Sequence, residues 1–444
     1  RWEITGGMWI EPDCNLISGE SWMRHLLYAK KYFREKYGID VKIGWNPDSF
    51  GYNWNMPQFY IQAGIDAFVT QKIGWNEYNV FPYRCFWWEA PDGSKILSYF
   101  PFDYVNTVDD PYRLVDWLRQ FEANTGFTKM MILFGVGDHG GGPSNEMLDR
   151  IENLKSVDIY PHIEYGTTAT YIDWLRKQDL SDLPVWNNEL YLEYHQGTFT
   201  TQAKVKEWNR KSETLLTNLE KFSTFSYQMG GKYEGENIKE AWKNVLFHQF
   251  HDILPGSSIR EVYIDAAEHY DEVNTIGNFE LSNTLTYLSK LIKTDNIKDA
   301  LPVVVFNPLN WERSDIANVS LPPDLKDDFA VFDLSGKEIP SQIIQKSKYN
   351  REVIFITSEV PPLGYKVYQL KKRKASSKTE KLIITGEKIE NEFLVVALDP
   401  KTGWLKSIID KRNGKEILSG AGNQLKILED KPSAWDAWNI GLTG

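Results

Sequence analysis

Cysteine is scarce in this chain of 444 residues, which contains only Cys14 and Cys85. Two cysteines cannot form a disulfide framework, so we expect a reducing compartment and place the protein in the cytoplasm. No apolar run approaches the ~18 residues that a membrane span requires, so we expect no membrane partner. No signal peptide is visible. The sequence opens at Arg1 without a methionine, and we expect the natural chain to continue beyond both ends.

Positive charge is also in deficit, with 50 Lys and Arg against 61 Asp and Glu and a net charge of −11. Nucleic acid is therefore not expected as a partner, because its phosphates need clustered cations. Aromatic residues, in contrast, make up 14% of the chain and include 17 Trp. Trp and Tyr stack on the apolar C–H faces of sugars while keeping a polar edge. Part of this surplus is consistent with a carbohydrate cleft, and most of it is expected to fill the core.

The length predicts about three domains and a multidomain fold that combines α/β, α and β parts. Residues 1–178 alternate short apolar runs with helical patterns, which predicts a mostly parallel sheet in a barrel or an open doubly wound arrangement. Residues 185–295 predict a three-helix bundle. Its helical patterns cover residues 203–229, 237–254 and 259–292. Residues 300–444 contain seven β-rich runs between turn signals and predict an antiparallel β-sandwich.

Several elements of the first domain carry local signals. Residues 19–36 predict an amphipathic helix with Ser18 as its N-cap. Residues 67–71 and 95–100 predict strands, and the run KMMILF at 129–134 predicts a buried strand.

The stretch VKIGWNPDSFGYNWN, residues 41–55, joins a short alternating strand to a break at Asn46-Pro47. Asp48 follows the break among aromatic residues. Barrel enzymes keep reactive groups at the ends of their strands, so Asp48 is a candidate catalytic carboxylate. The alternative is an ordinary turn aspartate.

A glycine-rich loop follows the run 129–134 and contains Asp138. Residues Gly135–Gly140 formally match G-x-G-x-x-G, the pattern of a dinucleotide loop. Asp138 would repel the pyrophosphate there, and Pro143 separates the glycines from the next helix. These residues fit better a glycine-rich loop that lets a substrate approach closely and presents Asp138 as an acid. The alternative is a plain flexible loop between a strand and a helix.

Two further stretches combine polar and aromatic residues. In FHQFHDILPG, His248 and His251 are three residues apart, and His251-Asp252 ends a predicted helix. Two carboxylates and a histidine at element ends suit a divalent metal, although a pair of histidines is often structural. Residues Glu193–Thr201 are typical of a sugar-facing loop, or of a packed connector between domains.

Taken together and in chain order, the four stretches resemble the α-mannosidases of glycoside hydrolase family 38. The resemblance is closest to the bacterial and cytosolic branch, whose sequences carry similar WNPDSFG, GDGGGGP-like and FHDILPGSSI-like segments. The resemblance spans nearly the whole chain and implies an α/β barrel, a three-helix bundle and β-sandwich material. It also implies a retaining, exo-acting and zinc-assisted hydrolysis of terminal α-linked mannose from oligosaccharides.

The resemblance also implies roles for individual residues. Asp48 matches the nucleophile that touches the zinc ion, and Asp138 matches the general acid/base. The remaining matches are His251 as a zinc ligand, Asp252 as a holder of sugar hydroxyls, Lys72 as the basic residue near the nucleophile, and His195 near an aromatic position of the sugar site. Two further ligands, a His-x-Asp motif, are absent here and expected before Arg1. We therefore expect these residues alone to hold zinc weakly and to show little activity.

Two other functions stay open from the residues alone. One is an NAD-dependent oxidoreductase that uses Gly135–Gly140, and the other is a non-catalytic carbohydrate-binding protein. A homo-oligomer is compatible with the sequence.

Overall fold

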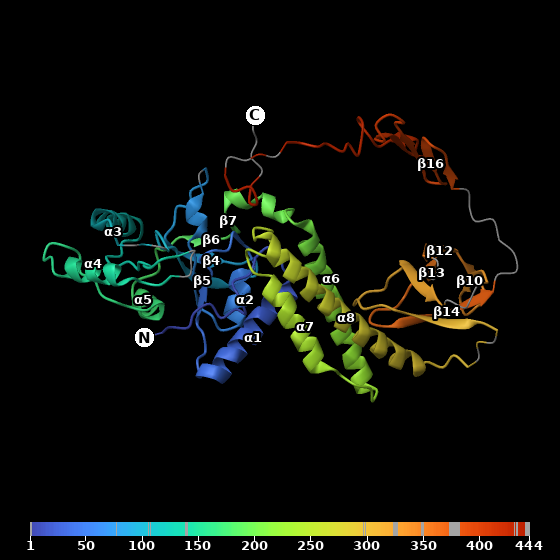
Figure 1. Ribbon diagram of the computed structural model, residues 1–444, viewed down its shortest axis with the longest axis horizontal. Coiled ribbons are helices and arrows are strands. Elements are labelled where there is room, and N and C mark those ends of the chain that lie inside the picture. The colour runs from blue at the N-terminus through green and yellow to red at the C-terminus, as the bar shows by residue number, and fades with distance from the viewer. Residues whose placement is uncertain are drawn as a thin grey trace. The chain divides into compact units, whose positions relative to one another are not determined.

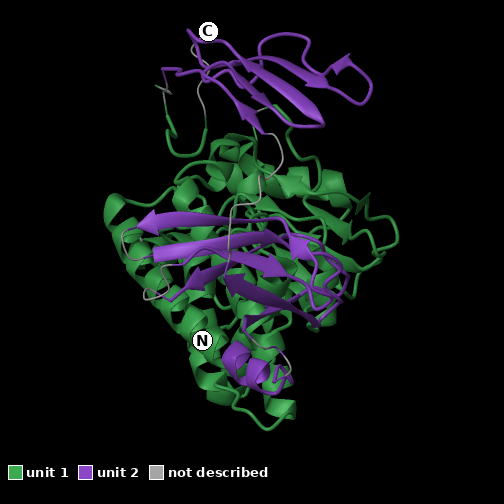
Figure 2. Cartoon of the chain, turned by 90° about the vertical axis from the view of Figure 1, so that its right-hand side faces the viewer, with its two compact units in different colours: residues 1–283, 431–444 green, residues 284–430 purple. Residues whose placement is uncertain are grey.

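The computed structural model describes residues 2–76, 78–104, 106, 108–137, 141–295, 297, 299–322, 327–347, 350–372, 382–429, 431 and 434–439. The chain divides into two compact units, residues 1–283 with 431–444 and residues 284–430 (Figure 2). Within the described ranges, no helix combines the length and the apolar character that crossing a bilayer demands.

The first unit is built on a five-stranded sheet with the order β1-β3-β5-β4-β6. Figure 1 labels β4, β5 and β6 of this sheet. Its strands are β1 Ile43–Trp45, β3 Ala67–Val69, β4 Cys85–Glu89, β5 Lys95–Tyr99 and β6 Val185–Trp186. β1, β3 and β5 are mutually parallel, and β4 runs antiparallel to β5 and parallel to β6. The predicted mostly parallel sheet is confirmed. Its closure into a barrel stays a prediction, because the described strands leave two edges.

Helices of the first unit follow the sequence signals closely. They are α1 Gly19–Tyr37, α2 Met56–Gln62, α3 Pro111–Thr125, α4 Asn145–Lys155 and α5 Thr168–Leu175. α1 begins where Ser18 Oγ accepts a hydrogen bond from the N–H of Ser21 at 3.2 Å, and it ends at Gly38 with φ 68°. Glycine adopts that left-handed conformation without a steric penalty. The predicted N-cap is confirmed.

The prediction of a buried strand at 129–134 is wrong. These residues are only half-buried and belong to no described sheet, with a bridge between Phe134 and Asn106. The hydroxyl of Tyr99 donates to the carbonyl of Met131 at 2.8 Å and accepts from its N–H at 3.0 Å. A side chain thus takes the hydrogen bonds that a neighbouring strand would supply.

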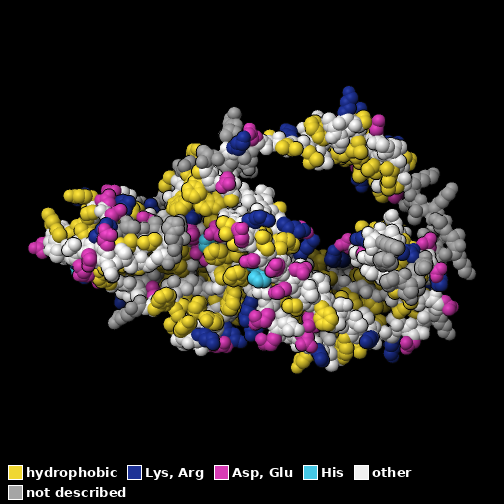
Figure 3. Space-filling model, in the orientation of Figure 1, with side chains coloured by type: hydrophobic (Ala, Val, Ile, Leu, Met, Phe, Trp, Pro, Cys, Tyr) yellow, Lys and Arg dark blue, Asp and Glu magenta, His cyan; other side chains and the backbone are white. Residues whose placement is uncertain are grey.

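Three long helices follow, α6 Ala203–Gln228, α7 Gly235–His248 and α8 Arg260–Lys290. Apolar side chains of α1, α6, α7 and α8 share one hydrophobic cluster with those of the sheet, so these helices and the sheet have a common core. Figure 3 shows acidic and basic side chains interspersed over this part of the surface.

α7 ends at His248, six residues before the predicted end at Leu254. The chain there pairs with residues near the N-terminus. The N–H of Asp13 donates to the carbonyl of Gln249 at 2.8 Å, and the N–H of His251 donates to that of Glu11 at 3.1 Å. These tertiary hydrogen bonds replace the last helical ones and present His251 from a turn.

The second unit contains antiparallel sheets, as predicted. One sheet has the order β11-β10-β14-β8 and a second has the order β12-β13-β9. Side chains of both sheets form one hydrophobic cluster that includes Phe329, Val353 and Tyr368. Their strands are β8 Leu301–Phe306, β9 Ile316–Leu321, β10 Phe329–Phe332, β11 Glu338–Ile339, β12 Ser341–Ser347, β13 Asn350–Ile356 and β14 Tyr365–Lys372. A third sheet is formed by β15 Ile383–Ile384, β16 Lys388–Glu390, β17 Leu394–Leu398, β18 Leu405–Asp410 and β19 Lys415–Glu416.

Candidate active site

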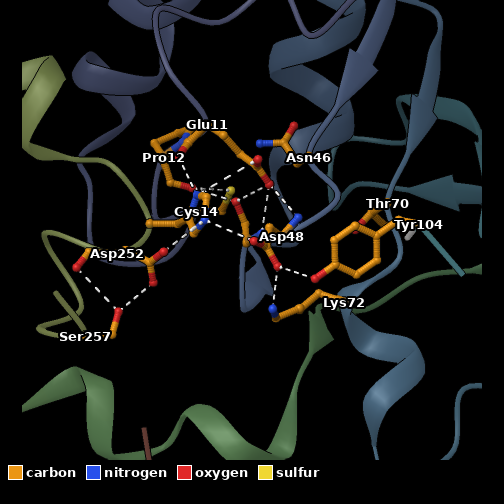
Figure 4. A network of polar contacts seen from close by, with 12 residues as sticks. Glu11, Pro12, Cys14, Asn46, Asp48, Thr70, Lys72, Tyr104, Asp252 and Ser257 are labelled. Carbon is orange, nitrogen blue, oxygen red and sulfur yellow. Dashed lines mark hydrogen bonds and ion pairs between the residues drawn. The ribbon is translucent and has the colours of Figure 1, made fainter. Parts of the chain in front are cut away.

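Asp48 lies in the loop after β1, where the chain leaves the sheet (Figure 4). The N–H groups of Asp48 and Ser49 both donate to Glu11 Oε1, at 2.6 and 2.9 Å, which fixes the backbone of the loop. Asp48 Oδ1 accepts hydrogen bonds from Lys72 Nζ and from the Tyr104 hydroxyl, the latter at 3.0 Å. The Asp48 side chain is 25% exposed, so the carboxylate is held and still accessible.

Lys72 begins a short 3-10 helix, Lys72–Trp75, just beyond β3. Its N–H donates to the carbonyl of Pro47 at 3.1 Å, which ties this turn to the loop of Asp48. Lys72 is only 3% exposed, and its Nζ lies 4.1 Å from the ring centroid of Trp75. A buried ammonium needs a charged partner, and Asp48 is that partner.

His251 reaches Asp48 from the turn after α7. Its Nδ1 lies 3.0 Å from the carbonyl oxygen of Glu11. A carbonyl only accepts, so Nδ1 carries a proton there. Its Nε2 lies 3.6 Å from Asp48 Oδ2 and 3.6 Å from Asp252 Oδ2. Ser257 Oγ donates to Asp252 Oδ1 at 2.7 Å. Asp48, Lys72, His251 and Asp252, predicted from separate parts of the chain, thus lie together.

The charges of this group support one another. Burial alone would raise the pKa of Asp48, but the contact with His251 and the charge of Lys72 outweigh it and hold that pKa well below its ordinary value. Burial would lower the pKa of His251, yet the charges of Glu11, Asp48 and Asp252 raise it to about 9. Asp48 is therefore ionised at neutral pH, and a positive charge at His251 is favoured.

His195 is close to this group but does not line open space. It is 1% exposed, and its ring stacks on Phe50 with centroids 3.5 Å apart. Burial and the charge of Lys72 lower the pKa of His195 to about 2, so the ring is neutral. The stacked rings of Phe50 and His195 form an aromatic layer close to Asp48, which we call the aromatic floor of the site.

The outcome differs for two other predicted features. Asp138 falls outside the described residues, so its distance from Asp48 is not given by the structure. The described parts of its loop approach each other, since the N–H of Val136 donates to the carbonyl of Gly142 at 3.3 Å. His248 points to α8, where its Nε2 lies 2.8 Å from His269 Nδ1, and does not join His251.

Three family models match the chain. The N-terminal domain of glycosyl hydrolases family 38 matches residues 1–189, the alpha mannosidase middle domain matches residues 193–288, and the C-terminal domain of family 38 matches residues 389–443. The chain belongs to glycosyl hydrolase family 38. The resemblance drawn from the four stretches is confirmed.

Several alpha-mannosidases are similar to the chain over nearly all of its length. The alpha-mannosidase of Saccharomyces cerevisiae is 32% identical, with 99% of this chain and 37% of that protein covered. Alpha-mannosidase 2C1 of Homo sapiens is 32% identical, with 98% and 40% covered. The chain thus spans about two fifths of the length of these relatives. The crystal structure of an alpha-mannosidase from Enterococcus faecalis V583 has the same fold, with a TM-score of 0.73, 22% identity, and 93% of this chain and 52% of that chain covered.

The family resemblance implies zinc, and the donor atoms around His251 fit part of such a site. Tetrahedral zinc with ligands at 2.0–2.2 Å places neighbouring donors about 3.4 Å apart. The observed 3.6 Å from His251 Nε2 to Asp48 Oδ2 and to Asp252 Oδ2 is close to this spacing. The hydrogen bond from Nδ1 to a carbonyl is the usual support of a metal-bound imidazole. Among the described residues, however, no group of three or more His, Cys, Asp and Glu side chains could hold a metal ion. A complete site needs further ligands.

Glu11 and Tyr104 contact Asp48 or its loop and were not predicted from the sequence. Glu11 is half-buried and binds the backbone of Asp48 through its carboxylate and His251 through its carbonyl. Tyr104 binds Asp48 through its hydroxyl. A single glutamate or tyrosine carries no spacing signal, because the partners of Glu11 lie 37 and 240 residues away. Only the fold brings them together.

We expect Glu11→Gln to lower kcat/KM for an aryl α-mannoside by about 10-fold, and Glu11→Ala by about 100-fold, in the intact protein. Glutamine keeps an acceptor for the two N–H groups but loses the negative charge near His251, whereas alanine loses both. The exposed Glu35→Gln, on α1, is the matched control. Equal activity of the alanine variant and the natural protein would show that Glu11 does not position Asp48.

Proposed function

We propose that the protein is a retaining, exo-acting α-mannosidase that removes terminal α-linked mannose from oligosaccharides with the help of zinc. The observation that carries this proposal is the environment of Asp48. One oxygen of its carboxylate is held by Lys72 and Tyr104, and the other faces His251 and Asp252. Such a carboxylate is ionised, oriented and accessible, which a nucleophile requires.

In the first step, Asp48 attacks the anomeric carbon of the mannose. A bond forms between Asp48 and the anomeric carbon as the bond from that carbon to the leaving oxygen breaks, through an oxocarbenium-like transition state. Lys72 and Tyr104 hold the carboxylate in place during the attack. We assign Asp138 the donation of a proton to the leaving oxygen, which requires a raised pKa in that residue.

In the second step, Asp138 takes a proton from a water molecule that attacks the same carbon, and Asp48 leaves as a carboxylate. Because the glycosyl group is transferred twice, the product keeps the α configuration. We expect the carboxyl groups of Asp48 and Asp138 to lie about 5–5.5 Å apart, as in other retaining enzymes.

Asp48 and His251 would hold the metal with ligands from outside the described residues. A bound zinc ion would act as a Lewis acid toward the 2- and 3-hydroxyls, which are cis in mannose. Asp252 would accept hydrogen bonds from these hydroxyls and is oriented for this by Ser257. The enzyme would prefer mannose because zinc and Asp252 would bind its 2- and 3-hydroxyls, which form a cis diol.

Membership in family 38 gives no support to an NAD-dependent oxidoreductase or to a purely sugar-binding protein. Both cysteines are free and buried. This suits the reducing cytoplasm in which we expect the enzyme to act.

The proposed function is tested by incubating the intact, zinc-supplied protein with aryl α-mannoside, aryl β-mannoside and aryl α-glucoside. We expect turnover of the first substrate alone, and proton NMR should show α-mannose as the first product. Initial release of β-mannose would contradict a retaining mechanism. No turnover of any α-mannoside would contradict the proposed function.

Asp138→Ala should slow substrates with poor leaving groups much more than activated ones. The reason is that an alkyl oxygen needs the proton of the general acid, while a nitrophenolate leaves without it. We expect the ratio of kcat/KM for the two substrates to change by about 100-fold. The measurement compares α-mannobiose with 2,4-dinitrophenyl α-mannoside. An equal loss on both would remove Asp138 from the role of acid.

A further inference from the structure

Two tryptophans from residues 434–439 pack near the site, although they follow in sequence the whole of the second unit: Trp438 lies near Lys72 and Phe50, and Trp435 contacts Trp438 and Trp75. The rings of Trp435 and Trp438 are stacked, with centroids 4.6 Å apart and planes within 3° of parallel. Trp438 also packs on His195 and Phe50, with centroid distances of 4.6 and 5.6 Å. The pair thus extends the aromatic floor of the site outward.

Backbone hydrogen bonds fix this segment to the turn that contains Gly197. The N–H of Gly197 donates to the carbonyl of Trp438 at 2.8 Å, and Thr201 Oγ1 donates to that of Ala437 at 3.1 Å. A Cβ at Gly197 would approach the Trp438 oxygen to 2.9 Å. Glycine is therefore required for this close contact, and the position of the two indoles is built into the first unit.

Trp435 is held in a conformation that a bulky residue rarely adopts. Its φ is 60°, in the left-handed region, and its side chain is 50% exposed. Glycine would fit this backbone without strain, so the indole is not explained by the local conformation. Its ring contacts Trp438 and Trp75, which both lie near Lys72. A strained residue with a half-exposed flat ring in this place indicates a function for the ring itself.

The position of the pair relative to Asp48 indicates which part of a substrate it meets. Asp48 faces His251 through Oδ2 and Lys72 through Oδ1. Lys72 Nζ lies 5.3 Å from the ring centroid of Trp438, so the indoles lie on the Lys72 side. With the hydroxyls of the bound mannose on the His251 side and its anomeric carbon at Asp48, the group attached to that carbon extends toward the indoles.

We propose that Trp435, braced by Trp438, is a stacking platform for the leaving-group sugar, and thus a specificity residue for oligosaccharides over simple mannosides. This proposal rests on the proposed function. The apolar C–H face of a pyranose packs on a flat indole face, and the parallel ring of Trp438 keeps that face in place. One face of Trp438 is already covered by His195, which leaves Trp435 as the accessible ring.

The test measures kcat/KM of the intact protein for α-mannobiose, which carries a leaving-group sugar, and for α-mannosyl fluoride, which carries none. We expect Trp435→Ala to lower the ratio of the two values by about 10-fold, mainly through KM for mannobiose. Trp435→Phe should restore a large part of the ratio, because phenylalanine retains a flat face. Trp311→Ala removes an exposed tryptophan of the second unit and is the matched control.

The outcomes separate this proposal from the proposed function. A ratio unaffected by Trp435→Ala, or an equal loss on both substrates, would overturn the platform while leaving the hydrolase intact. Failure of the natural protein to cleave either substrate would overturn the proposed function itself. If Trp435→Ala does not fold, the comparison of Trp435→Phe and Trp435→Leu replaces it, and a ratio that is equal in these two variants would overturn the platform.

Discussion

Replacing Asp48 with alanine should lower kcat for an aryl α-mannoside by about 10⁴-fold or more in the intact protein. The carboxylate forms the bond to the anomeric carbon, and no other described carboxylate is bound by both Lys72 and Tyr104. Loss of Asp48 also leaves Lys72 buried without its charged partner. Thermal denaturation should therefore accompany the kinetic assay, so that a loss of fold is distinguished from a loss of chemistry.

Asp173→Ala is the matched control for this substitution. Asp173 lies on α5 with a side chain that is 65% exposed, and it pairs with Arg176, the residue just after that helix. We expect its activity to stay within about twofold of the natural value. Retained turnover in the Asp48→Ala variant would show that another group attacks the sugar.

Replacing His251 with alanine should weaken zinc binding by at least about 100-fold. His251 contributes the one imidazole of the group, and its removal takes away the ring that faces the carboxylates of Asp48, Asp252 and Glu11. The measurement is the zinc content of the intact protein after dialysis, determined by elemental analysis. The zinc-induced rise in melting temperature provides a second readout and should disappear in the variant.

His269→Ala is the control, because His269 pairs with His248 and lies apart from Asp48. Its zinc content should equal that of the natural protein. An unchanged zinc content in His251→Ala would exclude His251 as a ligand.

Helices and strands could be predicted where neighbouring residues determine them, and the prediction failed where a contact between distant residues determines the structure. α1 follows from the Ser18 cap and the spacing of Trp22 and Leu26, all of which are near one another in sequence. The run 129–134 has a strand pattern as well, but Tyr99 takes its backbone hydrogen bonds. A hydroxyl 32 residues away leaves no trace in a local pattern.

The candidate site likewise combines residues that local sequence identifies with residues that only the fold brings into place. Asp48, His251 and Asp252 could be predicted, because each lies in a recognisable stretch at the end of an element, whereas Lys72 was implied only by the family resemblance. Glu11 could not, since its carboxylate and carbonyl serve partners that come close only in the folded chain. Trp435 could not either, because its place depends on a contact between residues 236 positions apart. The composition showed a surplus of tryptophan but did not indicate which tryptophan lies near the site.

The central claim is that Asp48 becomes covalently bound to the sugar. The most direct measurement is to treat the intact, zinc-supplied protein with a 5-fluoro-mannosyl fluoride, whose ring fluorine slows the second step while its fluoride leaving group keeps the first step fast. Peptide mass spectrometry then locates the adduct. We expect a fluoromannosyl ester on Asp48. An adduct on a different carboxylate, or turnover of the reagent with no adduct and release of β-mannose products, would contradict it.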